Sequence, residues 1–210
     1  TNESGQQLID ANTVTDVFLG MNLLREATSF LLDALKSNRK EEGFLQTRVL
    51  EINLRGGMSQ VADAILGNEM FTHYDRVAIA RLCEQAGLMQ RALENYTDVA
   101  DIKRVMQNGV GLTPEFLLTY FGSVSKEGSL EILREMLAHN MRANLANVVQ
   151  IAIKYSDQLG PESLIALFED FKSFEGLFHY LTAIVNFSQV PEVHLKYIQA
   201  AAQMQQFAEV

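Results

Sequence analysis

The chain has 210 residues, and 48% of them are hydrophobic, which predicts a well-packed interior and excludes an intrinsically disordered chain. Acidic residues outnumber basic ones by 26 to 17, for a formal charge of −9, so the surface repels phosphate backbones and anionic lipid headgroups. Composition therefore disfavours direct binding to nucleic acid or membranes, and no apolar run is long enough to span a bilayer.

Apolar residues recur with the spacing i, i+3, i+4, i+7 along the chain, and this spacing predicts helices. No segment shows sustained alternation of apolar and polar residues between turns, so we predict an all-α fold without strands. The predicted helical faces are, in chain order, Leu23, Leu24, Ala27, Phe30, Leu31 and Ala34; Val61, Ala64 and Ile65; Val77, Ile79, Ala80, Leu82 and Cys83; Phe116, Leu117 and Tyr120; Leu130, Leu133, Met136 and Leu137; Val148, Val149, Ala152 and Ile153; Leu164, Ile165, Leu167, Phe168 and Phe171; and Val193, Tyr197, Ile198 and Ala201.

Proline and glycine mark where these helices begin and end. All three prolines, Pro114, Pro161 and Pro191, precede a glutamate at a predicted helix start. Proline fits the first helical position, and a carboxylate behind it interacts favourably with the helix dipole. Glycines fall mainly between the periodic segments, where helix ends and tight turns favour them. We therefore predict helices of roughly 8 to 16 residues, joined by short connections that pair them as antiparallel hairpins.

Three stretches open a helix in nearly the same way, namely Gly20–Ala27, Ala86–Ala92 and Ala202–Ala208. Their closing alanines lie 65 and 116 positions apart, close to two and four units of about 30 residues. A helical unit that recurs at such a period predicts an α-solenoid, in which neighbouring units bury each other's apolar faces. Because we find no linker, residues 1–210 are predicted to form one continuous α-solenoid segment of stacked antiparallel hairpins.

The two ends of the sequence predict a piece of a longer repeat array. Residues 205–210 begin another helix by the repeat pattern, and neither Phe207 nor Val210 resembles the polar cap that closes a natural solenoid. Residues 1–5 lead equally abruptly into Leu8 and Ile9. The function of the chain is then expected to be part of the function of a longer protein.

The sequence shows no catalytic, cofactor or metal motif, and we predict that the chain is not an enzyme. Its histidines have none of the spacings that bind zinc. His73, Asp75 and Cys83 come nearest to a metal or catalytic group, but Asp75 fits better as a helix N-cap. Cys83 is the only cysteine, which is typical of a reducing compartment, and we expect it to be buried and structural. The histidines are His73, His139, His179 and His194.

An aromatic row of Phe168, Phe171, Phe174 and Phe178 follows a spacing of three and four residues. Such a row can line a peptide-binding groove, but packing between adjacent repeats is the favoured interpretation, because solenoid interiors need large apolar side chains. The acidic residues beside helical apolar positions are predicted to form a solvated face. These residues are Glu131, Glu135, Glu169 and Asp170.

Four runs carry a specific resemblance: Val61–Arg76, Leu82–Glu94, Ser163–Phe178 and Val185–Gln189 closely resemble the leg of clathrin heavy chains. The resemblance extends from about Thr15 to the end of the chain. The main departures are Phe116, where animal clathrins have a tryptophan, and two loops at residues 55–58 and 108–111.

The resemblance implies an α-solenoid of helical hairpins from the ankle and distal leg, in a family without catalytic residues. In that family three heavy chains join as a triskelion, and their legs pack into the polyhedral lattice of coated pits and vesicles. It further implies that light chains and adaptors bind outside this segment. The implied location is the cytosolic face of coats at the plasma membrane, the trans-Golgi network and endosomes.

The expected role is that of a structural strut whose shape depends on core residues, namely Leu93, Phe168, Phe171 and Tyr197. The alternative is a helical-repeat adaptor that binds a peptide in a concave groove. A cluster of exposed Asn, Arg or Lys along one helix face would favour the adaptor, and we find none in the sequence. An enzyme with a helical shell would instead need polar residues that converge in a pocket.

Overall fold

The computed structural model describes residues 10–108 and 111–204, and within these ranges every regular element is a helix. The all-α prediction is therefore confirmed. The chain forms two compact units, Thr1–Thr97 (unit 1) and Asp98–Val210 (unit 2). The helix predicted to begin at Gln205, which includes Phe207, lies outside the described residues. The last four residues of the third repeat frame, Ala202–Ala208, lie outside them too.

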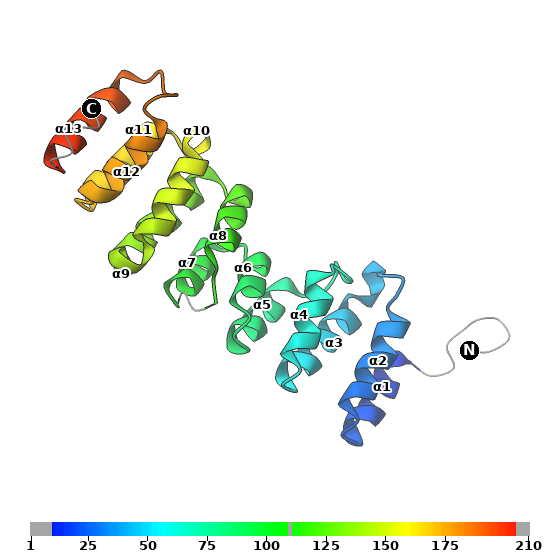
Figure 1. Cartoon of the computed structure of the whole chain (residues 1–210). Helices are drawn as coiled ribbons and strands as arrows, with labels where there is room; N and C mark the ends of the chain where they lie inside the picture. The colour runs from blue at the N-terminus through cyan, green and yellow to red at the C-terminus, as the bar shows by residue number, and fades with distance from the viewer. Residues whose placement is uncertain (1–9, 109–110, 205–210) are drawn as a thin grey trace. The chain divides into compact units, whose positions relative to one another are not determined.

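Unit 1 consists of helices that follow one another side by side in chain order, coloured blue to green in Figure 1. Helix α1 packs on α2, α2 on α3, α3 on α4, and α5 on α6, while α3 and α4 also pack against α5 and α6 respectively, as expected for stacked hairpins. The helices are α1 (Ala11–Gly20), α2 (Leu24–Ala34), α3 (Gly43–Arg55), α4 (Ser59–Gly67), α5 (Arg76–Gln85) and α6 (Met89–Asn95), with a short 3-10 helix at Lys40–Glu42.

Unit 2 continues the same architecture with less regular helices. Its α9 runs for 29 residues and is kinked at Asn140, whose side chain caps the second half by accepting from Ala143 N at 3.1 Å. Helices of seven residues or fewer also occur, so the predicted lengths of 8 to 16 residues were wrong for α6, α8 and α10, whereas the two halves of α9 on either side of Asn140 agree with them. The helices are α7 (Val99–Asn108), α8 (Pro114–Tyr120), α9 (Lys126–Lys154), α10 (Ser156–Leu159), α11 (Pro161–Asp170), α12 (Phe174–Ile184) and α13 (Pro191–Gln203), with a 3-10 helix at Phe121–Ser123.

The helix starts agree with the sequence signals. Pro114, Pro161 and Pro191 each occupy the first position of a helix, as predicted. Asp75 caps α5, since its side chain accepts a hydrogen bond from Ala78 N at 3.0 Å. The Asp75 hydrogen bond satisfies a backbone amide that has no partner within the helix, and proline at the first position has no amide to satisfy.

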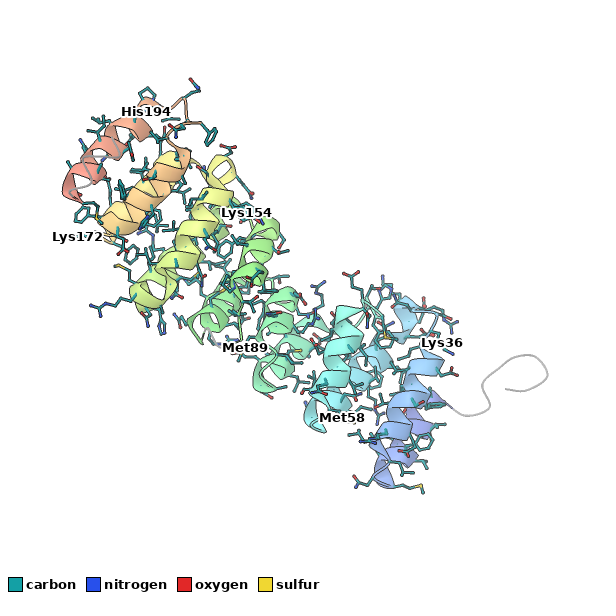
Figure 2. All side chains as sticks on the ribbon, viewed as in Figure 1. Lys36, Met58, Met89, Lys154, Lys172 and His194 are labelled. Carbon is teal, nitrogen blue, oxygen red and sulfur yellow. The ribbon has the colours of Figure 1, made fainter. Side chains whose placement is uncertain are left out.

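One turn recurs between the two helices of a hairpin. It joins α1 to α2, α3 to α4, α5 to α6, and α11 to α12, and in each case one residue has a positive φ. The residue after it donates its amide to a carbonyl five positions earlier, at 2.8–2.9 Å, which is the hydrogen bond of a Schellman motif. The positive-φ residues are Asn22, Gly57, Gly87 and Lys172. Figure 2 labels Met58 and Met89, which lie at two of these turns in unit 1.

The recurring turn sets the repeat frame of the chain. Five residues after each positive-φ residue stands a side chain that is almost completely buried: Ala27, Ala62, Ala92 and Leu177. Two of them, Ala27 and Ala92, are the closing alanines of the sequence frames. The repeat is thus present at four hairpins among the described residues, two of which were not predicted.

The core of each unit lies between its packed helices. Leu93, Phe168 and Tyr197 are buried as predicted, whereas Phe171 is half-buried because it follows the last residue of α11. Aromatic pairs connect neighbouring helices: Phe168 lies 5.8 Å from Tyr180, and Phe178 stacks on Tyr197 at 6.0 Å between ring centroids. Large side chains therefore hold successive helices together.

Candidate interaction surface

The predicted nearest approach to a reactive centre does not form one. Asp75 is engaged as the cap of α5, and the His73 side chain is exposed next to it. Cys83 points into the core of unit 1, where burial raises the pKa of its thiol to about 12, so the reactive thiolate is not populated near neutral pH. Among the described residues no three His, Cys, Asp or Glu side chains are placed to hold a metal ion.

The aromatic row divides between core and surface. Phe168 and Phe178 are buried, Phe171 is half-buried, and Phe174 at the start of α12 is 43% exposed. The four rings therefore do not line one stripe, because the turn at Lys172 separates the first two from the last two. The favoured interpretation, packing between repeats, is correct for Phe168 and Phe178 and wrong for Phe174.

Three residues of the predicted acidic face are exposed and Glu135 is half-buried, but the carboxylates are paired with cations from other helices of the stack. Lys103 of α7 donates to Glu131 of α9 at 2.8 Å, and this hydrogen bond raises the lysine pKa. Arg134 of α9 donates to Asp170 of α11 at 2.8 Å, and Lys196 of α13 bonds Glu169. Exposed pairs of this kind contribute little to stability individually, yet they neutralise part of the acidic surface.

Exposed apolar side chains form a second feature of the surface. In unit 1 the largest are Val17, Met21, Phe44, Met70 and Val77, and in unit 2 they are Ile153, Phe174, Phe187, Leu195 and Ile198. The sequence periodicity predicted that Val77, Ile153 and Ile198 face the core. This was wrong, because their side chains are 44%, 36% and 53% exposed. Within a short helix, one apolar spacing is compatible with two adjacent faces, and tertiary packing decides which of them is buried.

A groove of about 900 Å³ lies between the second half of α9 and the start of α12, within unit 2. Its apolar lining includes Leu145, Val149 and Ile153 from α9 and Phe174 from α12. The two helices approach closely because Gly176 has no side chain: a Cβ there would lie 2.7 Å from Leu145 Cδ1. This groove was not predicted from the sequence, because no periodic pattern shows which helix faces will meet.

The rim of the groove is polar and carries Arg142, Lys172, Glu175 and His179. His179 and Glu175 face each other at 4.0 Å. Lys172 lies at the positive-φ position of the turn before α12. Figure 2 labels Lys172 and also Lys154, the last residue of α9. Neither Arg142 nor Lys172 has a carboxylate or carbonyl partner among the described residues.

No described helix is long and apolar enough to cross a membrane. The described residues contain no converging reactive group. Their surface carries exposed apolar side chains, cross-helix ion pairs and an apolar groove. These are features that bind other macromolecules.

Comparison with known proteins gives consistent matches. Residues 2–145 match the family model described as a region in clathrin and VPS proteins. The chain is 57% identical over 205 residues to "Clathrin heavy chain" of Drosophila melanogaster and 56% identical over 205 residues to "Clathrin heavy chain 2" of Homo sapiens. It is 55% identical over 208 residues to "Probable clathrin heavy chain 1" of Caenorhabditis elegans. These alignments cover 98–99% of the chain and 12% of each relative.

Proposed function

Because the chain belongs to the clathrin heavy-chain repeat family, we propose that it is a structural segment of a vesicle coat, the leg strut of a heavy chain. The observation that carries this proposal is a stack of helical hairpins in a chain that aligns with clathrin heavy chains along nearly its whole length. The chain spans only 12% of those relatives, so the activity of a whole heavy chain enters here as part of the proposal.

The proposed mechanism is mechanical. Residues 1–210 form one continuous α-solenoid segment that lies beside other legs along an edge of a polyhedral lattice. Each contact between legs is small, below the area of a stable protein interface, so that single contacts remain reversible. Many such contacts act together in one trimer, and avidity then holds the lattice. Buried side chains such as Leu93, Phe168 and Tyr197 maintain the curvature of the strut.

The proposed partners are other heavy-chain legs in the triskelion and lattice, while light chains and adaptors bind outside this segment. The proposed location is the cytosolic face of coated pits and vesicles at the plasma membrane, trans-Golgi network and endosomes. The role requires no catalytic residue. The alternative, a helical-repeat adaptor, was based partly on the aromatic row, and the burial of Phe168 and Phe178 removes that basis.

Substitution of Leu93 tests the strut in the full-length protein. Leu93 is almost completely buried in α6, so Leu93→Asp places a carboxylate in the core and costs several kcal/mol, on the order of 2–7. We expect local unfolding around α6 and loss of lattice assembly, measured by turbidity and electron microscopy. Leu93→Met preserves volume and apolar character, so it should cost less than about 1.5 kcal/mol and keep assembly.

Hydrogen exchange of the same variants separates the effect on local folding from the effect on lattice assembly. Rapid exchange in α5 and α6 of Leu93→Asp, together with wild-type lattices, would disprove the requirement for a rigid strut. Unchanged exchange would instead show that the carboxylate is tolerated in the core.

A further inference from the structure

We propose that the side chains of Asn38, Gln46 and Thr47, here named the polar latch, fix the orientation of the α5–α6 hairpin on the α3–α4 hairpin. The latch lies where residues 35–42, which join α2 to α3, meet residues 68–75, which join α4 to α5. Its members are positioning residues, because they determine the shape of unit 1 through directional hydrogen bonds. Its effect on a lattice rests on the proposed strut, whereas its effect on the two hairpins does not.

Gln46 is completely buried in α3, and both ends of its amide group have partners. Its Nε2 donates to Asn38 Oδ1 at 3.0 Å and to Arg39 O at 3.4 Å, and its Oε1 accepts from His73 N at 2.9 Å. One side chain therefore connects the residues after α2 with the residues before α5. A buried amide costs free energy unless its donor and its acceptor are both satisfied, so Gln46 holds the two connections at a defined spacing.

Asn38 joins the same two connections by a second route. Its Oδ1 also accepts from Thr72 N at 3.1 Å, and its Nδ2 donates to Thr72 Oγ1 at 3.1 Å. The backbone at Asn38 has a φ of +44°, which asparagine tolerates better than most residues do. Figure 2 labels Lys36, two residues earlier in this connection. The amide of Asn38 thus meets both the buried Gln46 and the exposed Thr72.

The first turns of α3 bind the last residues before α5. Thr47 Oγ1 accepts from Asp75 N at 2.8 Å, and Asp75 in turn caps α5. Gly43 allows the close approach, since a Cβ there would lie 2.5 Å from His73 O. The backbone amides of Thr72, His73 and Asp75 therefore all donate to latch side chains.

Hydrogen bonds of this kind control orientation in a way that apolar packing does not. Burial of apolar surface is non-directional, and packed helices can slide past one another in shear movements. Hydrogen bonds weaken steeply with distance and angle, so a rotation of the α5–α6 hairpin would break several latch bonds at once. Because the curvature of a solenoid is the sum of small rotations between repeats, fixing one rotation fixes part of the shape.

The connection between α12 and α13 in unit 2 is bonded differently. Phe187 N and Ser188 N each donate to Ile184 O at 3.0 Å, within the end of α12 and the residues that follow it. Val190 N donates to Ser188 Oγ at 3.2 Å. These bonds close the connection on itself and do not join it to another connection. The latch is therefore not a general property of the segments between hairpins.

Spin labels on the full-length protein measure the orientation directly. The labels are carried by unnatural amino acids at Glu26 in α2 and Arg81 in α5, which are both exposed. We expect one narrow distribution of distances for wild type. Asn38→Gly, Gln46→Met and Thr47→Val should each broaden it. Glycine accepts the positive φ, while methionine and valine nearly preserve side-chain volume, so the main loss in each variant is hydrogen bonding.

Hydrogen exchange at single-residue resolution assigns each loss to one amide. Thr72 N loses its acceptor in Asn38→Gly, His73 N in Gln46→Met, and Asp75 N in Thr47→Val. The affected amide should exchange at least about tenfold faster, because local opening no longer has to break its hydrogen bond. Buried amides within α3 and α5 should keep their wild-type rates, which a role in core stability alone would not predict.

Matched substitutions either keep the latch bonds or remove an unrelated bond. Asn38→Asp retains the acceptor oxygen and tolerates the same φ, and Thr47→Ser retains the hydroxyl, so both should keep a narrow distance distribution. Thr119→Val removes a hydroxyl that bonds Glu115 O within α8, and it should behave like wild type.

Three results would overturn the proposal. Narrow distances in every latch variant would show that apolar packing alone fixes the orientation. Broad distances in Asn38→Asp and Thr47→Ser would show that the hydrogen bonds are not the cause. Faster exchange throughout unit 1 would assign these side chains to core stability instead. If Gln46→Met does not fold, the less buried Asn38→Gly and Thr47→Val decide the test.

Electron microscopy of cages assembled from the same full-length proteins tests the effect on a lattice. The latch variants should give a wider spread of cage diameters than wild type and Thr119→Val, because one rotation between repeats is no longer fixed. An unchanged spread would overturn this effect. Wild-type protein that forms no cages would contradict the proposed strut, while the label distances would still decide whether the latch positions the hairpins.

Discussion

Two buried serines in unit 2 show how one hydrogen bond changes the contribution of the same side chain. Ser156 Oγ lies 2.7 Å from Tyr180 Oη, and this bond connects α10 to α12. Ser129 in α9 is equally enclosed, but its Oγ has no hydrogen-bond partner among the described residues. A buried hydroxyl that has lost its contact with water costs free energy unless a protein group replaces that contact.

Alanine substitution of these serines should therefore change stability in opposite directions. Ser129→Ala removes an unsatisfied hydroxyl and introduces a better helix former, so the free energy of unfolding should rise by about 1 kcal/mol. Ser156→Ala leaves the Tyr180 hydroxyl buried without its partner and should lower the free energy of unfolding by about 1–2 kcal/mol. Urea unfolding of the two variants measures both values. Shifts of the same sign would contradict the assigned hydrogen bonding.

At the scale of single elements, the recurring turn depends on backbone conformation more than on residue identity. The same positive φ is adopted by Gly57, Gly87, Asn22 and Lys172. Glycine adopts this conformation without steric cost, and asparagine tolerates it, while lysine is rarely found there. The hydrogen bond that closes each turn is nevertheless the same, so helix packing on both sides selects the turn.

Gly87 and Gly20 form a matched pair that measures the cost of this turn. A Cβ at either position would meet no atom within 4 Å, so crowding contributes to neither substitution. Gly87 has a φ of +80°, and Gly87→Ala should destabilise the chain by about 1–2 kcal/mol. Gly20 ends α1 without a positive φ, so Gly20→Ala should be neutral or stabilising by up to about 1 kcal/mol. Equal melting temperatures of the two variants would rule out backbone conformation as the cause.

The same turns explain what the sequence could predict. The helices, the proline starts and the Asp75 cap follow from local rules and are present in the structure, whereas Val77, Ile153 and Ile198 of the predicted apolar faces are exposed. The repeat was visible at Ala27 and Ala92, where leucine, arginine and alanine recur in similar order. It was not visible at Ala62 and Leu177, because the shared property there is a backbone angle that different residues adopt.

The kink at Asn140 and the groove between α9 and α12 were beyond local prediction for a different reason. Asn140 has a non-helical backbone inside a segment that is otherwise helical on both sides. The groove exists because Gly176 allows Leu145 to approach α12, and this contact joins residues 31 positions apart. Both features depend on tertiary packing, which a periodic pattern does not specify.

At the scale of the molecule, the contacts of each unit connect helices that are close in sequence. In unit 1 the packed pairs join α1 to α2, α2 to α3, α3 to α4 and α5 to α6, and α3 and α4 also reach the second helix along. In unit 2, α11 likewise contacts both α12 and α13. This pattern is typical of repeat proteins, whose units contact only their neighbours. Each unit is therefore built as a helical repeat, and the prediction that residues 1–210 form one continuous solenoid segment needs a separate measurement.

Small-angle scattering of the 210-residue chain tests this proposal. About seven hairpins stacked at roughly 10 Å each should give a radius of gyration of about 24 Å. A compact globule of the same length should give about 17 Å. We expect the larger value and an elongated distance distribution in a monomeric sample. A value near that of the globule would mean that the two units fold back on each other, and the proposed strut would have to be abandoned.

The closure of each hairpin by hydrogen bonds within its own turn has a consequence during protein synthesis. A ribosome adds about 5–20 residues per second, so one hairpin repeat of about 30 residues takes seconds to emerge. Local helical structure forms in microseconds to milliseconds, since it requires no contact with residues that are still to be made. Each hairpin can therefore pack on its predecessor while the next is being translated. The cell then never has to protect more than a short stretch of exposed apolar chain.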